Sequence, residues 1–495
     1  MRASHWLAGR ALIVAVALAP LASLLAGCAP GSLSSPRPAG GRLPAVIITS
    51  ATEATASSAG FETLHIAALD PANGIARWTY ETTISPLRAH RAPVVAGGII
   101  YVSSDALPAT ASATLPVGSL TALSERDGHT VWTAHPGALS SEPVVSGGVV
   151  YASGIAFASA GQVVTSFFAL RADTGQQIWR ADLHAENRAG APPDQGFGVE
   201  DTLVVANGAV YDASNPSCFD TCGAAWLLAL RASDGKRLWK KRVTDAGTIG
   251  RPVVTSGALY TVVTSVSETQ PNPFRQVAAY SASDGAERWN VPMPAIGPLI
   301  AANGLLYATS IAQEQPPGSP ILTFTLRIVA LDPATGVTRW RVTTSTGDTD
   351  SYLPLAAMTP DILYVQSITN DGYSLAGLDP STGAVRWRTP LALLVGSMLM
   401  DGATLYAMTS FIQRGGATER NASLLAFSAS DGHAQWSAPL PAGSTSGEAP
   451  LARAGGVVVA AYLSATLSAY ETYGDHHLAW RVTTPGWLLG LVGVD

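Results

Sequence analysis

Residues 329–340 read Val-Ala-Leu-Asp-Pro-Ala-Thr-Gly-Val-Thr-Arg-Trp. An apolar run leads into an Asp-Pro turn, a glycine follows where positive φ is required, and a second strand then leads to tryptophan. Because two strands separated by such a turn pair with each other, the stretch predicts a β-hairpin. The pattern occurs nine times and ends each time at a tryptophan: Trp78, Trp132, Trp179, Trp239, Trp289, Trp340, Trp387, Trp436 and Trp480.

A second hairpin precedes eight of these copies. Residues 93–101 read Pro-Val-Val-Ala-Gly-Gly-Ile-Ile-Tyr, and residues 143–151 are nearly identical. Looser copies occupy Leu203–Tyr211, Pro252–Tyr260, Pro298–Tyr307, Pro354–Tyr364, Met398–Tyr406 and Pro450–Val459. We interpret each as a short strand, a glycine turn and a second strand that ends at the tyrosine. Two hairpins give four antiparallel strands, and a period of 44 to 60 residues is typical of an all-β propeller with four-stranded blades.

The number of blades follows from counting hairpins. Since nine hairpins carry tryptophan and eight lie upstream, Val46–Ser50 and Trp487–Val494 are expected to supply the two missing strands. Pairing of the last strand with the first would close the ring and remove its exposed edges. The last copy is irregular, because Gly474 comes early and His476 and His477 fill the turn. The count favours nine blades.

The repeated tryptophans resemble the tryptophan-docking repeats of propellers related to the pyrroloquinoline quinone (PQQ) dehydrogenases, over nearly all of residues 44–495. The resemblance implies a β-propeller, for which eight blades is the usual number. A tryptophan repeated at one position is expected to wedge between neighbouring blades, burying about 150–250 Å². The layout also resembles lipoprotein propellers of the β-barrel assembly machinery, which combine a lipid anchor with such blades and lack a cofactor.

Catalysis with PQQ requires more than the ring, as the resemblance describes it. Family members with this activity hold the quinone between a tryptophan and a disulfide of adjacent cysteines, beside calcium bound by carboxylate and amide side chains. An aspartate serves as base. This sequence has three cysteines and no adjacent pair. We therefore expect no cofactor and no enzymatic activity, with a PQQ-dependent quinoprotein dehydrogenase as the alternative.

The N-terminus has the features of an export signal, because two arginines precede an apolar run over residues 11–26. The stretch Leu-Ala-Gly-Cys that ends at Cys28 resembles a bacterial lipobox, which implies cleavage before Cys28 and lipid on that cysteine. Simple secretion is the alternative. Turn-forming residues then predict a flexible linker. We expect a protein held outside the cytoplasm at a bacterial membrane, with a signal peptide (1–27), a lipid-anchored linker (28–43) and one propeller domain (44–495).

Charge restricts the partners of the protein. Charged residues make up 13% of the chain, which is about half of the usual share. Removal of residues 1–27 leaves 27 basic and 35 acidic side chains, a net charge of −8. This balance disfavours nucleic acid. We expect a monomer whose partners are proteins or other components of the cell envelope.

The connections between the two hairpins of a unit are long and polar. We expect them at Ser104–Leu115, Ser153–Gln162, Ala213–Gly223, Ser265–Arg275, Ser310–Ile321 and Ser410–Asn421. Because strand direction alternates within a blade, these loops emerge on one face of the ring, which makes that face the candidate binding surface. One loop contains Cys218 and Cys222, which predict a disulfide outside the cytoplasm. Metal binding by this pair is the alternative, although no histidine lies nearby.

Three further groups of residues have weaker functional meaning. Residues 236–242 (Lys-Arg-Leu-Trp-Lys-Lys-Arg) hold all three lysines and are typical of a nucleic-acid or headgroup patch. Because Trp239 belongs to the repeat, we interpret these cations as protection of an outer strand against pairing. Asp348 and Asp350 are expected in a solvated turn, since other calcium ligands are missing. If the segment of His476 and His477 is extended, these adjacent side chains point to opposite faces, so we expect no metal site there.

No residue is identified as catalytic, because the sequence lacks a Gly-X-Ser-X-Gly elbow, a His-Glu-X-X-His motif and a phosphate-binding loop. The sequence predicts an exported, lipid-anchored β-propeller that acts as a non-catalytic binding or scaffold module. Its partner would bind the long loops. PQQ-dependent dehydrogenation and binding of envelope glycan by exposed aromatic side chains are the alternatives.

Overall fold

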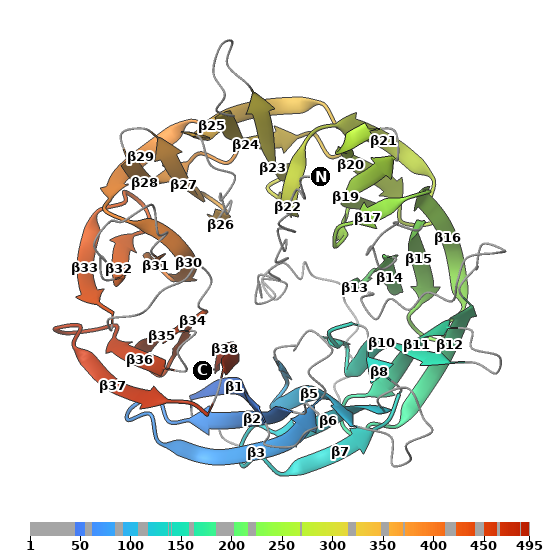
Figure 1. Ribbon diagram of the computed structural model, residues 1–495, viewed down its shortest axis with the longest axis horizontal. Helices are drawn as coiled ribbons and strands as arrows, with labels where there is room; N and C mark the ends of the chain where they lie inside the picture. The colour runs from blue at the N-terminus through green and yellow to red at the C-terminus, as the bar shows by residue number, and fades with distance from the viewer. Residues whose placement is uncertain are drawn as a thin grey trace, which may run out of the picture. The chain divides into compact units, whose positions relative to one another are not determined.

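The strands of the chain form nine sheets that stand around one axis (Figure 1). The computed structural model describes residues 45–54, 62–84, 93–106, 117–136, 138–139, 141–157, 163–184, 202–215, 224–267, 270–314, 323–347, 356–369, 372–410, 422–440, 450–462, 466–485 and 487–494. Within these ranges there are strands and turns only, and so no helix long and apolar enough to cross a membrane. The fold is an all-β propeller with nine blades.

We number the blades in chain order and give the strands of each from the inside of the ring outward. Blade 1 consists of β38 (Trp487–Val494), β1 (Val46–Ala54), β2 (Glu62–Leu69) and β3 (Ala76–Ile84). Blade 2 consists of β4 (Val94–Ala96), β5 (Ile99–Ala106), β6 (Val117–Ser124) and β7 (Thr130–Ala134). Blade 3 consists of β8 (Ala138–Leu139) with β9 (Val144–Ser146), then β10 (Val149–Phe157), β11 (Val163–Arg171) and β12 (Gln177–His184).

The next three blades follow the same order. Blade 4 consists of β13 (Thr202–Ala206), β14 (Ala209–Ser214), β15 (Ala225–Arg231) and β16 (Arg237–Thr244). Blade 5 consists of β17 (Gly247–Ile249) with β18 (Val253–Thr255), then β19 (Ala258–Ser267), β20 (Gln270–Ser281) and β21 (Glu287–Pro292). Blade 6 consists of β22 (Ala295–Ala302), β23 (Leu305–Glu314), β24 (Thr323–Leu331) and β25 (Thr338–Gly347).

The last three blades complete the ring. Blade 7 consists of β26 (Ala356–Met358), β27 (Leu363–Thr369), β28 (Gly372–Leu378) and β29 (Val385–Leu391). Blade 8 consists of β30 (Leu394–Asp401), β31 (Thr404–Ser410), β32 (Ser423–Ser428) and β33 (Ala434–Pro439). Blade 9 consists of β34 (Leu451–Ala454), β35 (Val457–Tyr462), β36 (Thr466–Glu471) and β37 (Leu478–Thr483).

The ring closes through its two ends. β1 pairs antiparallel with β38, and Val46 lies opposite Val494. The expectation that residues near both ends supply the missing strands is confirmed, and with it the count of nine blades instead of the usual eight. The described residues from Ala45 onward form one compact unit that contains both closing strands. Because its core and closure are complete, the ring is expected to fold without residues 1–44.

Apolar clusters fill every joint between neighbouring blades. Each of nine clusters combines buried residues from two adjacent blades. At the closing joint, Ile47 and Leu491 of blade 1 pack with Val459 and Leu467 of blade 9. A single four-stranded sheet leaves both faces open to water, so each blade needs a neighbour on both sides. The ring therefore derives its hydrophobic stabilisation from these joints.

Tryptophan and tyrosine of one blade share a hydrogen-bond acceptor in the next. Trp340 Nε1 donates to the Pro380 carbonyl at 3.0 Å, and the Tyr307 hydroxyl donates to the same oxygen at 3.0 Å. Both side chains flank Ala330 in the ladder, and a β-bulge follows it directly. Among the described residues, seven tryptophans donate to the following blade in this way: Trp78, Trp132, Trp179, Trp239, Trp289, Trp340 and Trp480.

The joint between blades 7 and 8 departs from this pattern. Trp387 Nε1 is buried and has no hydrogen-bond partner among the described residues. Tyr364 still donates to the Ala429 carbonyl, at 3.1 Å. Gly377 takes the place of the alanine found in the other blades, and the Trp387 indole lies where a Cβ would be. The missing methyl group thus lets the indole lean toward its own blade.

The joint between blades 8 and 9 differs because the last turn is longer. The hydrogen bond from Glu471 N to His477 O spans one residue more than its counterparts in the other blades. His476 has φ 55° in place of the usual glycine, and its ring stacks on Trp436 with centroids 5.0 Å apart and planes at 16°. The expected irregularity of this copy is confirmed. His476 and His477 lie in the turn and not on an extended strand.

The second strand of each blade extends further than the sequence indicates. We expected this strand to end at the tyrosine and a loop to occupy Ser265–Arg275, yet β19 continues to Ser267 and β20 begins at Gln270. Ser265 pairs with Phe274 across this hairpin. The expectation was wrong because Thr, Ser and Val alternate there, and β-branched residues of this kind suit a strand as well as a polar loop.

Candidate binding surface

The second strands of all blades end on the same side of the ring, because strand direction alternates. We call this side the long-loop face. In the described part of the chain it is bounded by the ends of the second strands: Ala54, Ala106, Phe157, Ser214, Ser267, Glu314, Thr369, Ser410 and Tyr462. The opposite side, which we call the tight-turn face, carries the glycine turns. The two faces therefore differ. The connections on the long-loop face vary strongly in length from blade to blade, whereas the glycine turns do not.

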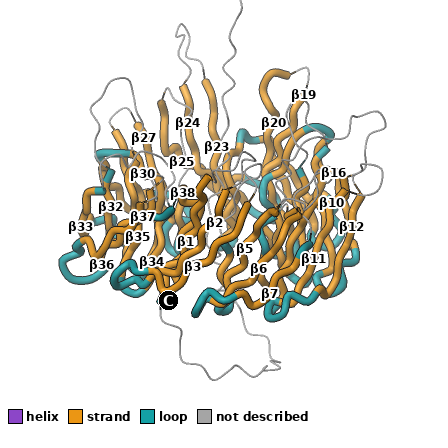
Figure 2. The backbone as a smooth tube through the Cα atoms, turned by 60° about the horizontal axis from the view of Figure 1, so that its bottom comes forward, coloured by secondary structure: helices purple, strands orange, loops and turns teal. Residues whose placement is uncertain are grey.

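Blades 5 and 6 rise above the rest of the long-loop face (Figure 2). Their hairpins β19–β20 and β23–β24 contain strands of 9 to 12 residues. Near the tip of the first hairpin, Val266 is 45% exposed and Phe274 is 48% exposed. The other large apolar side chains with comparable exposure among the described residues lie in the tight turns or at the beginning of the outer strands that follow them: Ile75, Val131, Ile178, Leu238, Val337, Val385, Tyr473 and Leu478. Val266 and Phe274 are thus the apolar contact points of the long-loop face.

Hydrogen bonds between blades hold the base of this face in place. The Asn215 amide both donates to Ile249 O at 2.8 Å and accepts from Ile249 N at 2.7 Å, which ties blade 4 to blade 5. Gln366 Oε1 accepts from Val395 N at 3.0 Å and ties blade 7 to blade 8. Polar groups that are satisfied in this way fix the ends of the strands. These hydrogen bonds therefore hold Asn215 and Gln366 against the neighbouring blades.

Several residues singled out from the sequence lie outside the described residues. These are Cys28, Cys218, Cys222, Asp348 and Asp350. Asn215 is the last described residue before the segment that contains Cys218 and Cys222, and its side chain is hydrogen-bonded to blade 5. The disulfide and the lipid anchor stay predictions. An intact mass two hydrogens below that of the reduced protein would support the disulfide.

Acidic side chains on the tight-turn face serve the turns. Asp332 accepts hydrogen bonds from Ala334 N at 2.8 Å and from Arg339, and these bonds, that of Arg339 first, lower its pKa. Asp70 pairs with Arg77, and Asp379 with Arg386, at the same seven-residue spacing. A hydrogen bond from Ser381 is the main cause of the lowered pKa of Asp379. These carboxylates are occupied by turn and strand groups of their own blade, so they have a structural role.

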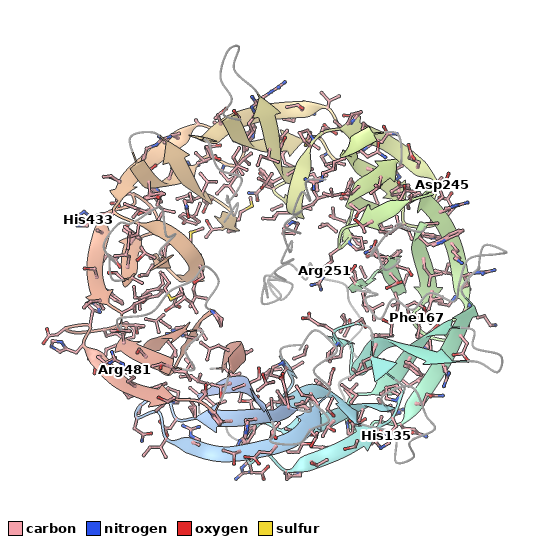
Figure 3. All side chains as sticks on the ribbon, viewed as in Figure 1. His135, Phe167, Asp245, Arg251, His433 and Arg481 are labelled. Atoms are coloured by element: carbon pink, nitrogen blue, oxygen red, sulfur yellow. The ribbon has the colours of Figure 1, made fainter. Side chains whose placement is uncertain are left out.

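Few charged side chains line the inner wall in the described part of the ring. In the described inner strands, the charged residues are Asp401 and Arg453, and these two pair with each other at 2.9 Å. Arg251, between β17 and β18, points toward the centre (Figure 3). No group of three or more His, Cys, Asp or Glu side chains that could hold a metal ion occurs in the described ranges. Glu125 is buried, which raises its pKa, but it lies in a tight turn.

Comparison with known proteins agrees with this architecture. A family model described as outer membrane protein assembly factor BamB matches residues 116–223, 223–392 and 325–481. The chain belongs to this family. The BamB family model thus covers blades 3 to 8, the two outer strands of blade 2 and most of blade 9. No curated protein is significantly similar to the chain in sequence.

Solved structures with a similar fold include BamB and quinohemoprotein alcohol dehydrogenases. BamB from Moraxella catarrhalis is 12% identical with a TM-score of 0.41, and the match covers 78% of this chain and 95% of that one. The quinohemoprotein alcohol dehydrogenase ADHIIG from Pseudomonas putida HK5 is 14% identical with a TM-score of 0.45, covering 82% and 74%. At this similarity neither structure carries an argument about function.

Sequence reasoning missed two parts of the candidate surface. Val266 and Phe274 were placed in a loop, although alternation of β-branched residues before Val266 was a signal for strand. The interblade role of Asn215 had no sequence signal, because its partner Ile249 belongs to another blade. The expectation that the loops between hairpins share one face is consistent with the strand order.

Proposed function

We propose that the protein is a non-catalytic propeller that binds a protein partner of the cell envelope through the long-loop face. The exposure of Phe274 and Val266 on the raised hairpin of blade 5 carries this proposal. Aromatic side chains that project from a rigid frame are typical anchors of protein interfaces. The family description, an assembly factor for outer membrane proteins, supports a scaffold role.

PQQ-dependent dehydrogenation is less well supported by the residues present. The cofactor would need adjacent cysteines and free carboxylates for calcium, but the chain has no adjacent cysteines and Asp401 of the inner wall is paired with Arg453. These residues do not fit PQQ. Titration of the purified protein with PQQ and calcium should leave the absorption spectrum of the quinone unchanged. A saturable spectral change would support the enzyme instead.

Attachment to a membrane through lipid on Cys28 is the second part of the proposal. It rests on the lipobox resemblance and on the linker predicted at residues 28–43. Several buried acyl chains on one cysteine would hold the ring at the bilayer, since each buried CH₂ contributes about 0.8 kcal/mol. Cys28→Ser should move the protein from the membrane to the soluble fraction. Retention of the variant in membranes would contradict the anchor.

Site-specific crosslinking tests the binding face. A photoreactive residue at position 274 should give a discrete adduct with one envelope protein in intact cells, because position 274 projects from the long-loop face. The matched control is position 337 on the tight-turn face, where Val337 is 61% exposed. Phe274→Asp should abolish co-purification of the same partner, and Val337→Asp should preserve it. Equal adducts at both positions would refute the proposed face.

A further inference from the structure

The outermost strand of blade 4, β16, concentrates positive charge. Lys236, Arg237, Lys240, Lys241 and Arg242 lie on it or directly before it, and they include every lysine of the chain. The formal net charge of the whole chain is −6, so the remaining residues together carry −11. Five cations on one strand of an acidic protein create a local positive field at the outer wall of the ring.

A tryptophan on the neighbouring strand organises two of these cations. Trp226 of β15 lies opposite Arg242 in the ladder. Lys240 Nζ is 4.2 Å from the centroid of its ring, and the Arg242 guanidinium carbon is 5.8 Å away. Because the face of an indole attracts cations, Trp226 holds both groups on the same side of the blade. We call Trp226 and the five cations the blade 4 patch (Trp226, Lys236, Arg237, Lys240, Lys241 and Arg242).

Acidic neighbours neutralise only part of the blade 4 patch. Asp245 pairs with Arg242 at 2.8 Å, and Figure 3 places Asp245 at the outer rim of the ring. Asp234 lies 3.8 Å from Lys236 and also pairs with Arg231. Arg237 and Lys241 are exposed and form no ion pair with a described residue. An exposed leucine, Leu238, lies between them at 42% exposure.

Protection of the strand edge does not account for this concentration of charge. The outer strands β7 and β33 have edges that are unpaired in the same way within the described chain, yet they carry no lysine or arginine. If edge protection required five cations, these strands would need them too. The blade 4 patch therefore points to a ligand that only this part of the wall meets.

We propose that the blade 4 patch binds the anionic phospholipid headgroups of a bilayer surface. Tryptophan, an exposed aliphatic side chain and long cationic side chains are the residues that proteins place at the membrane interface. The wall of the ring is convex, with β16 at its circumference (Figure 1), so a plane can touch it along one blade only. The blade 4 patch matches such a narrow contact, because its five cations lie along one strand or directly before it. An acidic protein segment is the competing partner.

Vesicle binding tests the proposal independently of the long-loop face and of the lipid anchor. The protein would begin at residue 29, which keeps the complete ring and removes Cys28. Each cation near an anionic surface contributes about 1 kcal/mol, or about fivefold in partitioning. Lys236→Gln, Arg237→Gln and Lys241→Gln together should lower partitioning into phosphatidylglycerol-containing vesicles by about a hundredfold.

A control variant removes the same charge elsewhere. Arg341, Arg388 and Arg481 are exposed on the outer strands of blades 6, 7 and 9. Changing all three to Gln should lower vesicle binding by less than about threefold, because they lie far from the blade 4 patch in the ring. Circular dichroism and the melting temperature of both variants should match the parent, since the six side chains are exposed.

The outcomes distinguish a lipid surface from an acidic protein segment as the ligand of the blade 4 patch. Binding to phosphatidylglycerol vesicles, absence of binding to phosphatidylcholine alone and selective loss in the patch variant would support the proposal. Equal binding to both vesicles, or equal loss in both variants, would overturn it. Binding of soluble polyglutamate without binding of either vesicle would assign the patch to an acidic protein and would likewise overturn it.

Discussion

Trp340 and Trp387 occupy the same position in neighbouring blades, but only Trp340 donates a hydrogen bond to the next blade. The cause is one residue in the ladder, Ala330 beside Trp340 and Gly377 beside Trp387. A side chain of one carbon decides whether the indole Nε1 reaches the carbonyl of the neighbouring turn, since the Trp387 ring itself still packs against Gly432 of that turn. At the scale of single residues, the joints of the ring are therefore not equivalent.

This difference predicts unequal costs for the same substitution. Trp340→Phe removes ring volume and a hydrogen bond, whereas Trp387→Phe removes ring volume and an unpaired buried N–H. Since a hydrogen bond contributes about 0.5–1.5 kcal/mol and an unpaired buried group costs about 1–3 kcal/mol, Trp340→Phe should destabilise more, by about 2 kcal/mol. Urea unfolding followed by far-ultraviolet circular dichroism measures the difference. Equal urea midpoints for the two variants would show that the indole N–H of Trp387 has a hydrogen-bond partner.

The hairpin turns form the next scale, and their glycines have two separate requirements. Gly336 has φ 73°, and a Cβ there would approach the Trp289 ring to 2.7 Å. Gly304 has φ 72° in the other hairpin of blade 6, and a Cβ there would meet nothing within 4 Å. Gly336 and Gly304 thus have the same backbone conformation, but only Gly336 lies against the preceding blade.

Alanine substitution separates the two requirements. Gly304→Ala should cost about 1–2 kcal/mol, which is the strain of a left-handed residue. Gly336→Ala should cost a further 1–3 kcal/mol or so, because the methyl group displaces Trp289 from its packed position. Thermal unfolding of the two variants in parallel gives the comparison. If both lose the same stability, the turn does not hold the indole of the neighbouring blade.

Closure of the ring belongs to the whole molecule. β38 gives blade 1 its inner strand, and Trp480 Nε1 donates to Pro71 O at 2.7 Å across the same joint. Gly493 lies against the backbone of Arg453 in blade 9, so a side chain does not fit there. The C-terminal segment is therefore part of the core and not a tail.

Removal of residues 487–495 should open the ring. Blade 1 would lose its inner strand and expose the edge of β1, which is a template for pairing with other chains. We expect a melting temperature that is lower by about 10 °C or more. The shortened chain loses several kcal/mol of stabilisation from apolar burial, and a loss of about 1 kcal/mol lowers the melting temperature of a large protein by roughly 2–4 °C. Size-exclusion chromatography should show aggregates. Removal of Asp495 alone is the control and should change neither quantity.

The sequence by itself determined the blade type, the number of blades and the way the ring closes, because hairpins depend on turn residues and on alternation over a few positions. The glycines and tryptophans of the repeat report such local geometry directly. Only the tertiary structure decided that Tyr307 and Trp340 share one carbonyl and that β19–β20 rises above the long-loop face. It also decided that Trp387 Nε1 has no hydrogen-bond partner among the described residues.

The gathering of Lys240 and Arg242 over Trp226 was likewise a tertiary result. The sequence showed the run of cations, but Trp226 lies on another strand and is reached only through the register of the sheet. Contacts between strands and between blades depend on distances that a linear pattern does not contain. For this reason the repeat predicted the frame of the protein, while the positions of its candidate binding surfaces required the folded ring.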